Sequence, residues 1–344
     1  MVVVSNMKKF VSRFVLLLVL LSVLFSFSDI WIVKASGTIY IRADGSVEGT
    51  DKIQRDGDVY TLISDISGSI IVERDNVVLN GAGYRLQGDG NENGITLSIN
   101  NNITVKNMQL SSFNIGIVVM GSDNNKILEN TITDNFRGLD LTSSENNTIS
   151  GNHIANNIGG IALENMYNSI FGNTIANNSN FGVYLYSAGF NNIIGNNITN
   201  NGRGISVYIC YNNVIYHNNF VNNTNHVETD GSNGIWDNGE EGNYWDNYTG
   251  VDNDGDCIGD TSYTLDENNQ DKYPLVELYI IPEFPTWTPM LLTLIALAVA
   301  LAIYKRKLPK TPIARARMIY RLYPETFLEV KHLQNSYAPT RSPS

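Results

Sequence analysis

Positively charged residues are scarce in the long central part of this chain. Residues 36–282 contain ten Lys and Arg against thirty Asp and Glu, a net charge of −20, whereas the whole chain carries −11. Because nucleic acids bind proteins through Lys and Arg that neutralise their phosphates, this balance argues against a nucleic-acid partner. The negative charge suits a protein that lies in a cation-rich surface layer.

Typical helix formers are also scarce in the middle of the chain, where Asn and Gly dominate. No apolar stripe with the helical period of about 3.6 residues runs through this region. The absence of helices also argues against a leucine-rich horseshoe, which needs several Leu at short spacing and a helical back half.

Glycine recurs instead at a fixed interval. Six glycines are spaced 22 residues apart, namely Gly94, Gly116, Gly138, Gly160, Gly182 and Gly204. An aliphatic residue directly follows each glycine, and another lies two positions further on. Equal intervals of this length indicate a chain that stacks one small unit on the next.

A second column of residues supports the same unit. An Asn recurs at similar intervals, at Asn107, Asn130, Asn152, Asn173, Asn196 and Asn218. Each unit offers three short apolar patches with period-two alternation between polar turns, which is typical of strands. We expect an all-β parallel β-helix of roughly seven to eight coils of about 22 residues over 36–230. Its first coil would run from Ile70 to Gly88.

The residue types fit positions in such a coil. Ile and Val suit the interior, because β-branched side chains pack well on a pleated surface. We expect the repeating glycines at corners, where they would adopt a positive φ. We expect the Asn columns to have a structural role, with amides bonding from one coil to the next.

The chain resembles a known protein family. The Asn-rich coils, with Gly242–Tyr248, Asp252–Asp260 and Tyr273–Leu275, are similar to NosD-like proteins, which overlap a family of carbohydrate-binding proteins and sugar hydrolases. The resemblance implies a right-handed β-helix and copper delivery. Copper sites favour His, Met and Cys. The candidate ligands are scattered among the coils, at His153, His217, His226, Met108, Met120 and Met166.

Both ends of the chain carry apolar runs. Residues 1–35 read as a secretory signal, with the basic residues Lys8, Lys9 and Arg13 before an apolar stretch, or as an uncleaved N-terminal anchor. Cleavage would fall before Ser36.

The second apolar run predicts a transmembrane segment over 280–304. Phe284 to Tyr304 is 21 residues without a charge, and nine basic residues against two acidic ones lie within 284–344. The positive-inside rule places the tail 305–344 in the cytoplasm and the repeats outside, on a cell membrane. The motif beginning at Pro282 resembles PEF-type sorting signals of archaeal surface proteins.

Residues 231–279 are expected to form an acidic, aromatic C-terminal cap. Trp236, Tyr244, Trp245 and Tyr248 would seal the open end of the β-helix. Four aspartates have the spacing of a calcium loop, namely Asp252, Asp254, Asp256 and Asp260. We expect calcium as the one possible cofactor, against the alternative of a solvated acidic turn. The only two cysteines, Cys210 and Cys257, could pair or stay free.

The outward positions of the strand after each repeating glycine give a second candidate site. Three aromatic and two acidic side chains would lie on one face, namely Tyr184, Tyr186, Tyr208, Asp140 and Glu164. Aromatic rings beside carboxylates suit sugar rings, although a stack that only stabilises the sheet is the alternative.

These residues do not form a recognisable pair of catalytic carboxyls, so we expect no catalytic residues. The favoured role is carbohydrate binding or structural adhesion at the cell surface, with glycan or surface-layer partners. A polysaccharide lyase or hydrolase on the same fold is the first alternative, and copper delivery is the second.

Overall fold

The computed structural model describes residues 37–281. All described residues belong to one compact unit. The expected signal, transmembrane segment and basic tail lie outside the described residues. No helix within 37–281 is long and apolar enough to cross a membrane.

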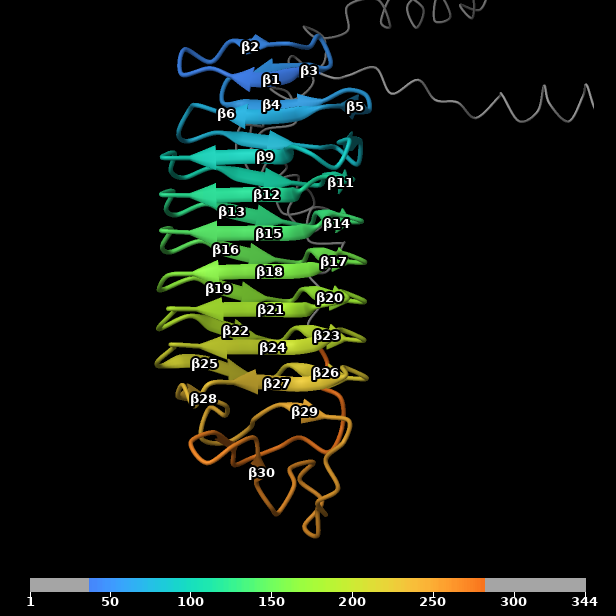
Figure 1. The fold of residues 1–344 in the computed structure, drawn as a ribbon, viewed down its shortest axis with the longest axis vertical. Coiled ribbons are helices and arrows are strands. Elements are labelled where there is room, and N and C mark those ends of the chain that lie inside the picture. Colours follow the sequence, from blue (N-terminus) through green and yellow to red (C-terminus); the bar gives the residue numbers. More distant parts are fainter. Residues whose placement is uncertain (1–36, 282–344) are drawn as a thin grey trace, which may run out of the picture. The chain divides into compact units, whose positions relative to one another are not determined.

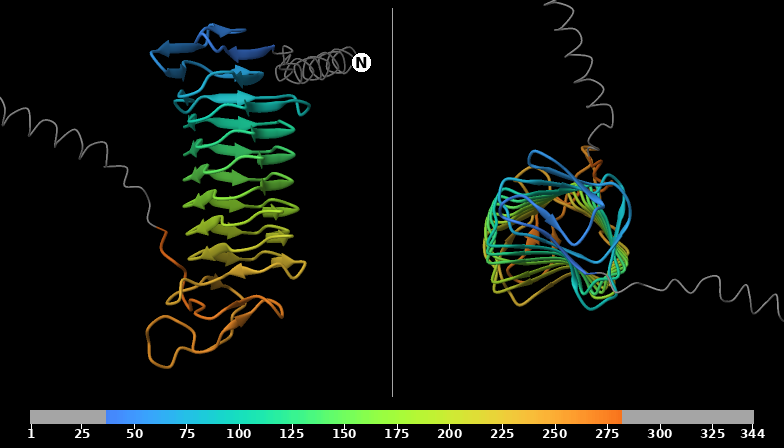
Figure 2. Two further views of the ribbon diagram at one scale, coloured as in Figure 1. Left: turned by 90° about the vertical axis from the view of Figure 1, so that its left-hand side faces the viewer. Right: turned by 90° about the horizontal axis from the view of Figure 1, so that it is seen from above.

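The described residues form a right-handed parallel β-helix with three faces, each a sheet that runs along the stack (Figure 1). Viewed along the axis, successive coils superimpose (Figure 2). This confirms the expected fold and the expected number of coils, since eight parallel pairings link nine strands along one of the faces. The stack begins at Thr38, one turn earlier than the expected first coil at Ile70.

We name the three sheets face A, face B and face C. Face A contains β1 (Thr38–Ile41), β6 (Ser69–Val72), β9 (Asn93–Ser98), β12 (Ile115–Met120), β15 (Arg137–Thr142), β18 (Gly159–Glu164), β21 (Phe181–Tyr186), β24 (Arg203–Tyr208) and β27 (Asn225–Thr229), with β2 (Val47–Glu48) antiparallel at its end.

Face B contains β4 (Val59–Leu62), β7 (Val78–Asn80), β10 (Thr104–Lys106), β13 (Lys126–Leu128), β16 (Thr148–Ser150), β19 (Ser169–Phe171), β22 (Asn192–Ile194), β25 (Asn213–Tyr216) and β28 (Gly234–Ile235), with β3 (Ile53–Asp56) antiparallel at its end. Face C contains β5 (Ile66–Ser67), β8 (Arg85–Gln87), β11 (Gln109–Ser111), β14 (Thr131–Thr133), β17 (His153–Ala155), β20 (Thr174–Ala176), β23 (Asn197–Thr199), β26 (Asn219–Val221) and β29 (Tyr244–Trp245). A separate hairpin joins β30 (Tyr263–Thr264) to β31 (Gln270–Asp271).

Equivalent apolar side chains stack coil over coil in the interior. On face A, Ile117 pairs with Leu139, and Leu139 pairs with Ile161. All three side chains are fully buried. The core is therefore a continuous column in which each coil covers the apolar residues of the next.

The repeating glycines have a different role from the expected one. They lie inside the strands of face A, and none of the six has a positive φ. A Cβ built on Gly160 would lie 2.2 Å from the carbonyl oxygen of Gly182. Glycine is needed at these positions because the backbones of neighbouring coils approach too closely for a side chain.

Asparagine forms three buried ladders, where the sequence indicated one column. The ladders consist of Asn125, Asn147, Asn168, Asn191 and Asn213; of Asn130, Asn152, Asn173, Asn196, Asn218 and Asn243; and of Asn135, Asn157, Asn178, Asn201 and Asn223. In the second, Asn173 Oδ1 accepts hydrogen bonds from the backbone N–H and from Nδ2 of Asn152, at 2.9 and 3.0 Å.

One member of the expected Asn column was misplaced. Met108 occupies the ladder position before Asn130, because its backbone N–H donates to Asn130 Oδ1. Asn107 lies at the adjacent corner with φ of 53°. Asn is suited to this conformation as well as to the ladder, so composition alone did not separate the two positions.

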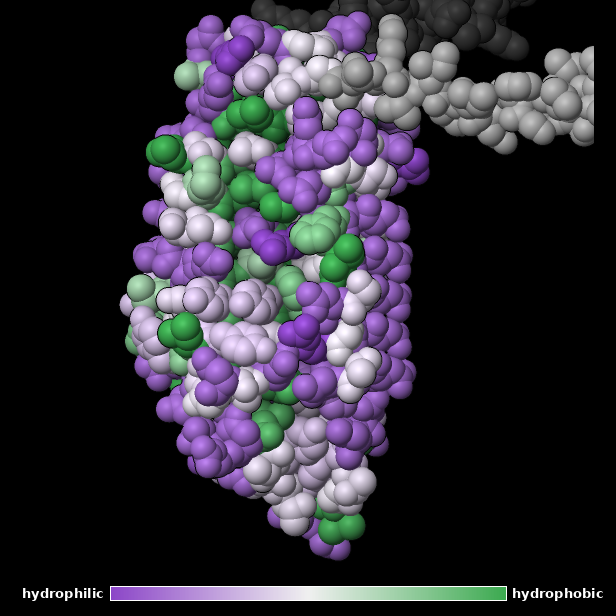
Figure 3. Space-filling model, viewed as in Figure 1, coloured by the Kyte–Doolittle hydropathy of each residue, from purple (hydrophilic) through white to green (hydrophobic). Residues whose placement is uncertain are grey.

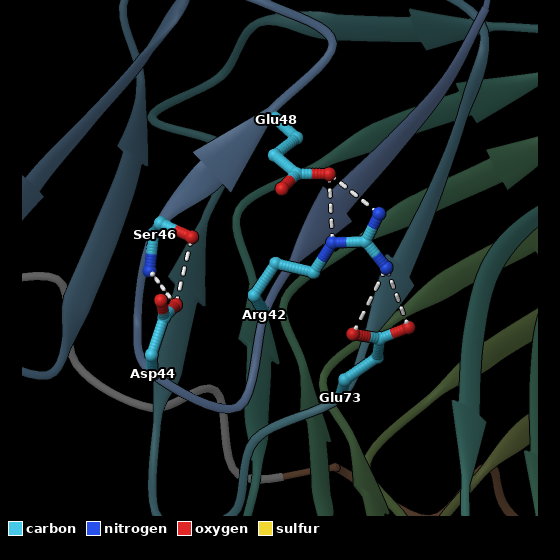
Figure 4. Close-up of polar contacts among 5 residues, drawn as sticks. All are labelled: Arg42, Asp44, Ser46, Glu48 and Glu73. Carbon is cyan, nitrogen blue, oxygen red and sulfur yellow. Dashed lines mark hydrogen bonds and ion pairs between the residues drawn. The ribbon is translucent and has the colours of Figure 1, made fainter.

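The N-terminal end of the stack is held by an arginine (Figure 4). Arg42 donates to Glu48 at the end of β2 and to Glu73, which follows β6 in the next coil. Its guanidinium also lies 4.0 Å from the centre of the Tyr40 ring. The antiparallel strands β2 and β3 leave short edges at this end, which limits edge-to-edge pairing.

The C-terminal segment, residues 231–281, packs aromatic rings on the last coil. Trp236 and Trp245 are buried, and the Trp245 ring stacks on Phe220 at 4.3 Å. Tyr279 lies against His217 with ring centroids 4.0 Å apart.

Candidate functional site

The three tyrosines predicted to cluster do lie together on the outer surface of face A. Tyr184 and Tyr186 belong to β21, and Tyr208 in β24 is the register partner of Tyr186. The Tyr184 ring centroid lies 6.3 Å from that of Tyr186 and 5.7 Å from that of Tyr208. The period-two alternation of these strands turns Val183, Leu185 and Val207 inward and the three rings outward.

The two predicted carboxylates lie on the same face in earlier coils. Asp140 shares a column with Tyr184 through Ala162, because Asp140 pairs with Ala162 and Ala162 with Tyr184. Its carboxylate forms an ion pair with Arg137. Glu164, at the end of β18, pairs in register with Thr142 and is near enough to influence the ionisation of Tyr184.

Tyr184 and Tyr208 remain neutral phenols over the physiological range. Burial raises the pKa of Tyr184 and of Tyr208 above the ordinary value of about 10. A hydrogen bond with Glu228 raises the pKa of Tyr208 further. Each ring therefore offers an apolar surface and a hydroxyl group, which is the chemistry that a sugar ring requires.

The arginines of this face are already engaged. Arg137 is paired with Asp140, and Arg203 donates to Glu228 at 2.5 Å and to Asn180 at 2.6 Å. Figure 3 views the molecule from the side of face A, and hydrophilic and hydrophobic residues are interspersed over it. The face offers aromatic rings without an unpaired guanidinium beside them.

Sequence reasoning missed a second group of exposed aromatic rings. Tyr167, Phe190 and Tyr211 lie at the corner between face A and face B in three consecutive coils and are 50%, 40% and 45% exposed. Phe190 lies 5.5 Å from Tyr167 and 5.4 Å from Tyr211, centroid to centroid. The spacing of these residues in sequence is 23 and 21, so a strict 22-residue comparison did not align them.

Three of the four predicted calcium ligands converge in the C-terminal segment. Carboxylate oxygens of Asp252, Asp254 and Asp256 lie within 4.8 Å of one another. Asp260 instead accepts hydrogen bonds from the backbone and side-chain amides of Asn253. The nearby charge of Asp256 raises the pKa of Asp254, so the loop concentrates negative charge that a cation would relieve.

The Asp252 carboxylate organises this loop. It accepts hydrogen bonds from the backbone N–H groups of Gly255 at 2.7 Å and Cys257 at 3.0 Å. Burial opposes ionisation of Asp252, but the amide hydrogen bonds outweigh it and lower the pKa. The carboxylate is therefore ionised and fixed in position.

The soft ligands expected of a copper site lie apart. His217 Nε2 is 2.5 Å from Glu241, and His226 Nε2 is 2.8 Å from Asp246. Met108 is in the core, and the two cysteines are free, with Cys210 buried and Cys257 exposed. Among residues 37–281 the three aspartates are the one group of His, Cys, Asp and Glu able to hold a metal. These hard oxygen ligands do not fit copper, which prefers softer donors.

Solved structures of three other proteins resemble part of this chain. The periplasmic alginate epimerase AlgG is 17% identical with a TM-score of 0.36, and the match covers 50% of this chain and 49% of the epimerase chain. The tailspike protein 2 enzymatically active domain of bacteriophage CBA120 is 13% identical with a TM-score of 0.38, covering 55% and 39%. Pectate lyase Pel9A is 13% identical with a TM-score of 0.31, covering 66% and 80%.

This chain thus spans about half the length of the epimerase chain that it matches. At these identities and TM-scores the likeness carries nothing further to this chain. No curated protein matches the sequence. The family model described as periplasmic copper-binding protein (NosD) matches residues 47–250, which is more than half of the chain. The protein therefore belongs to the NosD family.

Proposed function

We propose that this protein binds a neutral carbohydrate chain through Tyr184, Tyr186 and Tyr208 on face A. The observation that carries the proposal is the contact between the three rings on neighbouring coils, with Tyr184 within 6.3 Å of both others. An outward ring in one coil is placed beside the ring of the next by the register of the strands. A rigid solenoid face of this kind holds its contacts ready before the ligand arrives.

The charge of the face selects a neutral ligand. Arg137 and Arg203 are both neutralised by carboxylates, and Glu164 adds a further negative charge in the neighbouring coil. Residues 36–282 carry a net charge of −20, which would repel a polyuronate. Sugar hydroxyls can donate to Glu164 and Glu228 while apolar ring faces lie on the tyrosines.

Display at the cell surface is part of this proposal. The family to which the chain belongs is described as periplasmic, which agrees with export of the repeats. The apolar run 284–304 would anchor the chain, with the tail 305–344 in the cytoplasm. A structural or adhesive role follows, in which the β-helix holds surface glycan or surface-layer material.

Calcium is proposed as a structural ion for the C-terminal segment. Asp252, Asp254 and Asp256 would bind it through carboxylate oxygens, the ligands that this cation prefers. The ion would neutralise the loop and hold it, with no part in carbohydrate contact.

The test uses the full-length chain and a panel of neutral polysaccharides (a glucan, a mannan, a xylan and a galactan), with polygalacturonate as the charged comparison. We expect binding to at least one neutral polymer, weakened about tenfold in Tyr184→Ala. Tyr84→Ala is the control, because Tyr84 is an exposed tyrosine, at 38%, between β7 and β8 in an earlier coil. Equal weakening by both variants, or binding to polygalacturonate alone, would reject the proposal.

The same samples test the enzymatic alternative. Release of reducing ends or of unsaturated products would assign a hydrolase or a lyase, with Asp140 and Glu164 as the first residues to replace. We expect no release.

A further inference from the structure

The corner between face A and face B contains a column of left-handed residues. Six consecutive coils place a residue with φ between 54° and 61° at this position, namely Asn102, Asn124, Asn146, Tyr167, Phe190 and Asn212. Asn is the side chain that adopts this conformation at low cost, and four of the six positions have it. Tyr167 and Phe190 break the rule, because bulky side chains rarely occupy this region.

Burial does not compensate for this backbone cost. The two side chains remain 50% and 40% exposed, so each leaves much of its ring in water. The two rings contact each other, with centroids 5.5 Å apart. An Asn at either position would adopt the corner conformation without strain. What sets Tyr167 and Phe190 apart is that two strained, exposed aromatic rings lie in contact on consecutive coils, and this combination points to a functional surface.

The rings form one ledge along the axis. Tyr167 and Phe190 are nearly parallel, at 12°, and Tyr211 meets Phe190 edge to face, at 88°. The Tyr211 hydroxyl donates to the Met166 sulfur at 3.2 Å. We name Tyr167, Phe190 and Tyr211 the corner ledge.

The ledge adjoins the tyrosines of face A along the chain. Its three residues follow β18, β21 and β24, and the last two of these strands carry Tyr184, Tyr186 and Tyr208. The two aromatic groups therefore share two coils and are separated along the chain by residues 187–189 in one coil and by residues 209–210 in the next.

The corner segments that carry the ledge differ from those of neighbouring coils in having no charged residue. The corner segments 165–168, 187–191 and 209–213 contain no acidic or basic residue. Neighbouring coils have Asp123 and Glu145 before the ledge and Asp230 after it. Without a cation the ledge cannot recognise a phosphate or a carboxylate, but it fits the apolar faces of uncharged sugars.

We propose that the corner ledge is a second stacking subsite, which receives the continuation of the neutral carbohydrate chain bound at Tyr184, Tyr186 and Tyr208. This rests on the function proposed above and adds a length requirement to it. A long chain would contact both aromatic groups, whereas a disaccharide would contact one.

The test is Phe190→Asn in the full-length chain, which installs the residue that four equivalent corners already have. We expect the melting temperature to rise, because strain is relieved, and affinity for a neutral hexasaccharide to fall about three- to tenfold. Affinity for the disaccharide of the same polymer should not change. Tyr211→Leu, at a position without a positive φ, should weaken hexasaccharide binding in the same way.

The matched control is Ile99→Asn, since Ile99 has φ of 59° and is 80% exposed away from the ledge. It should raise the melting temperature without affecting hexasaccharide binding. If both ledge variants bind the hexasaccharide normally while Tyr184→Ala does not, the ledge is rejected and the proposed function stands. If no variant alters binding, both fail. Loss of binding to phosphatidylcholine vesicles in Phe190→Asn, with normal glycan binding, would assign the ledge to lipid and overturn the proposal.

Discussion

The buried carboxylate of Asp271 accepts the indole N–H of Trp245 at 2.8 Å. The same carboxylate accepts the backbone N–H of Asn243 at 2.7 Å and that of Tyr273 at 3.1 Å. Asn243 is the last member of a buried Asn ladder, and Trp245 stacks on Phe220. Asp271 therefore joins the C-terminal segment to the end of the solenoid.

This carboxylate makes the stability of the C-terminal segment depend on pH. Burial raises the pKa of Asp271 to about 6, and the hydrogen bonds from Asn243, Trp245 and Tyr273 only partly oppose the rise. A raised pKa favours the folded state at low pH, so this stability is fully present below about pH 4 and is lost as the pH rises through 6. The difference of about two pKa units corresponds to about 3 kcal/mol.

Hydrogen exchange at the amides of Asn243 and Trp245, corrected for the intrinsic rate, measures this effect. We expect opening of the segment to become easier between pH 4 and pH 7. Asp271→Asn should remove the pH dependence, because an amide does not titrate in this range. If the protection of these amides in the natural chain did not change with pH, the role given to Asp271 would be contradicted.

Removal of one ladder amide should destabilise the centre of the stack. Asn173→Ala deletes the acceptor for two hydrogen bonds from Asn152 and leaves the Ile149 carbonyl without its donor. Because these groups are buried, we expect a loss of about 2–4 kcal/mol in denaturant unfolding. Asn107→Ala, at the corner that the sequence placed in the same column, should cost much less. Equal losses would show that the ladder has no special role.

Glycine replacement tests the close approach of the coils. In Gly160→Ala the new Cβ would meet the Gly182 carbonyl oxygen, so we expect a loss of about 2 kcal/mol or more. Gly37→Ala is the control, since a Cβ added there would have no atom within 4 Å and the φ of Gly37 is not positive. The melting temperatures of the two variants should differ clearly. Coincident melting curves would show that a steric clash is not the reason why glycine repeats.

Calcium should raise the melting temperature of the full-length chain at millimolar concentration, and a chelator should lower it. Asp254→Asn should remove this response and should stabilise the calcium-free protein, because it relieves repulsion from Asp256. Glu267→Gln, an exposed change in the same segment, should leave the response intact. A melting curve indifferent to calcium would reject the site.

The two thiols should react at very different rates. Burial raises the pKa of the Cys210 thiol, whereas Cys257 is exposed. A thiol reagent should therefore label Cys257 first and reach Cys210 only on unfolding. Labelling of neither cysteine without prior reduction would show that the two pair in the mature protein.

The sequence predicted the coils because glycine and the inward aliphatic residues recur in strict register. The same alternation placed Tyr184, Tyr186 and Tyr208 on one surface. The two additional Asn ladders escaped notice because Asn-Asn pairs occur at the corners. In each pair, the side chain of one Asn points inward, and the other Asn adopts the left-handed backbone conformation. Composition alone does not separate the two.

The corner ledge was hidden for a related reason. Tyr167 and Phe190 occupy a position where the other coils favour Asn, and small changes in coil length move them out of a fixed interval. Backbone conformation, which the sequence does not reveal, identifies them as equivalent. Contacts from Asp271 to Trp245 were likewise hidden, because they join residues 26 positions apart outside the repeat.

The most direct test of the carbohydrate face is hydroxyl-radical footprinting of tyrosine side chains, with and without the neutral polysaccharide that binds best. We predict that Tyr184, Tyr186 and Tyr208 become protected when the polymer is present, while Tyr84 keeps its reactivity. Binding that leaves all three rings as reactive as before would contradict the central claim.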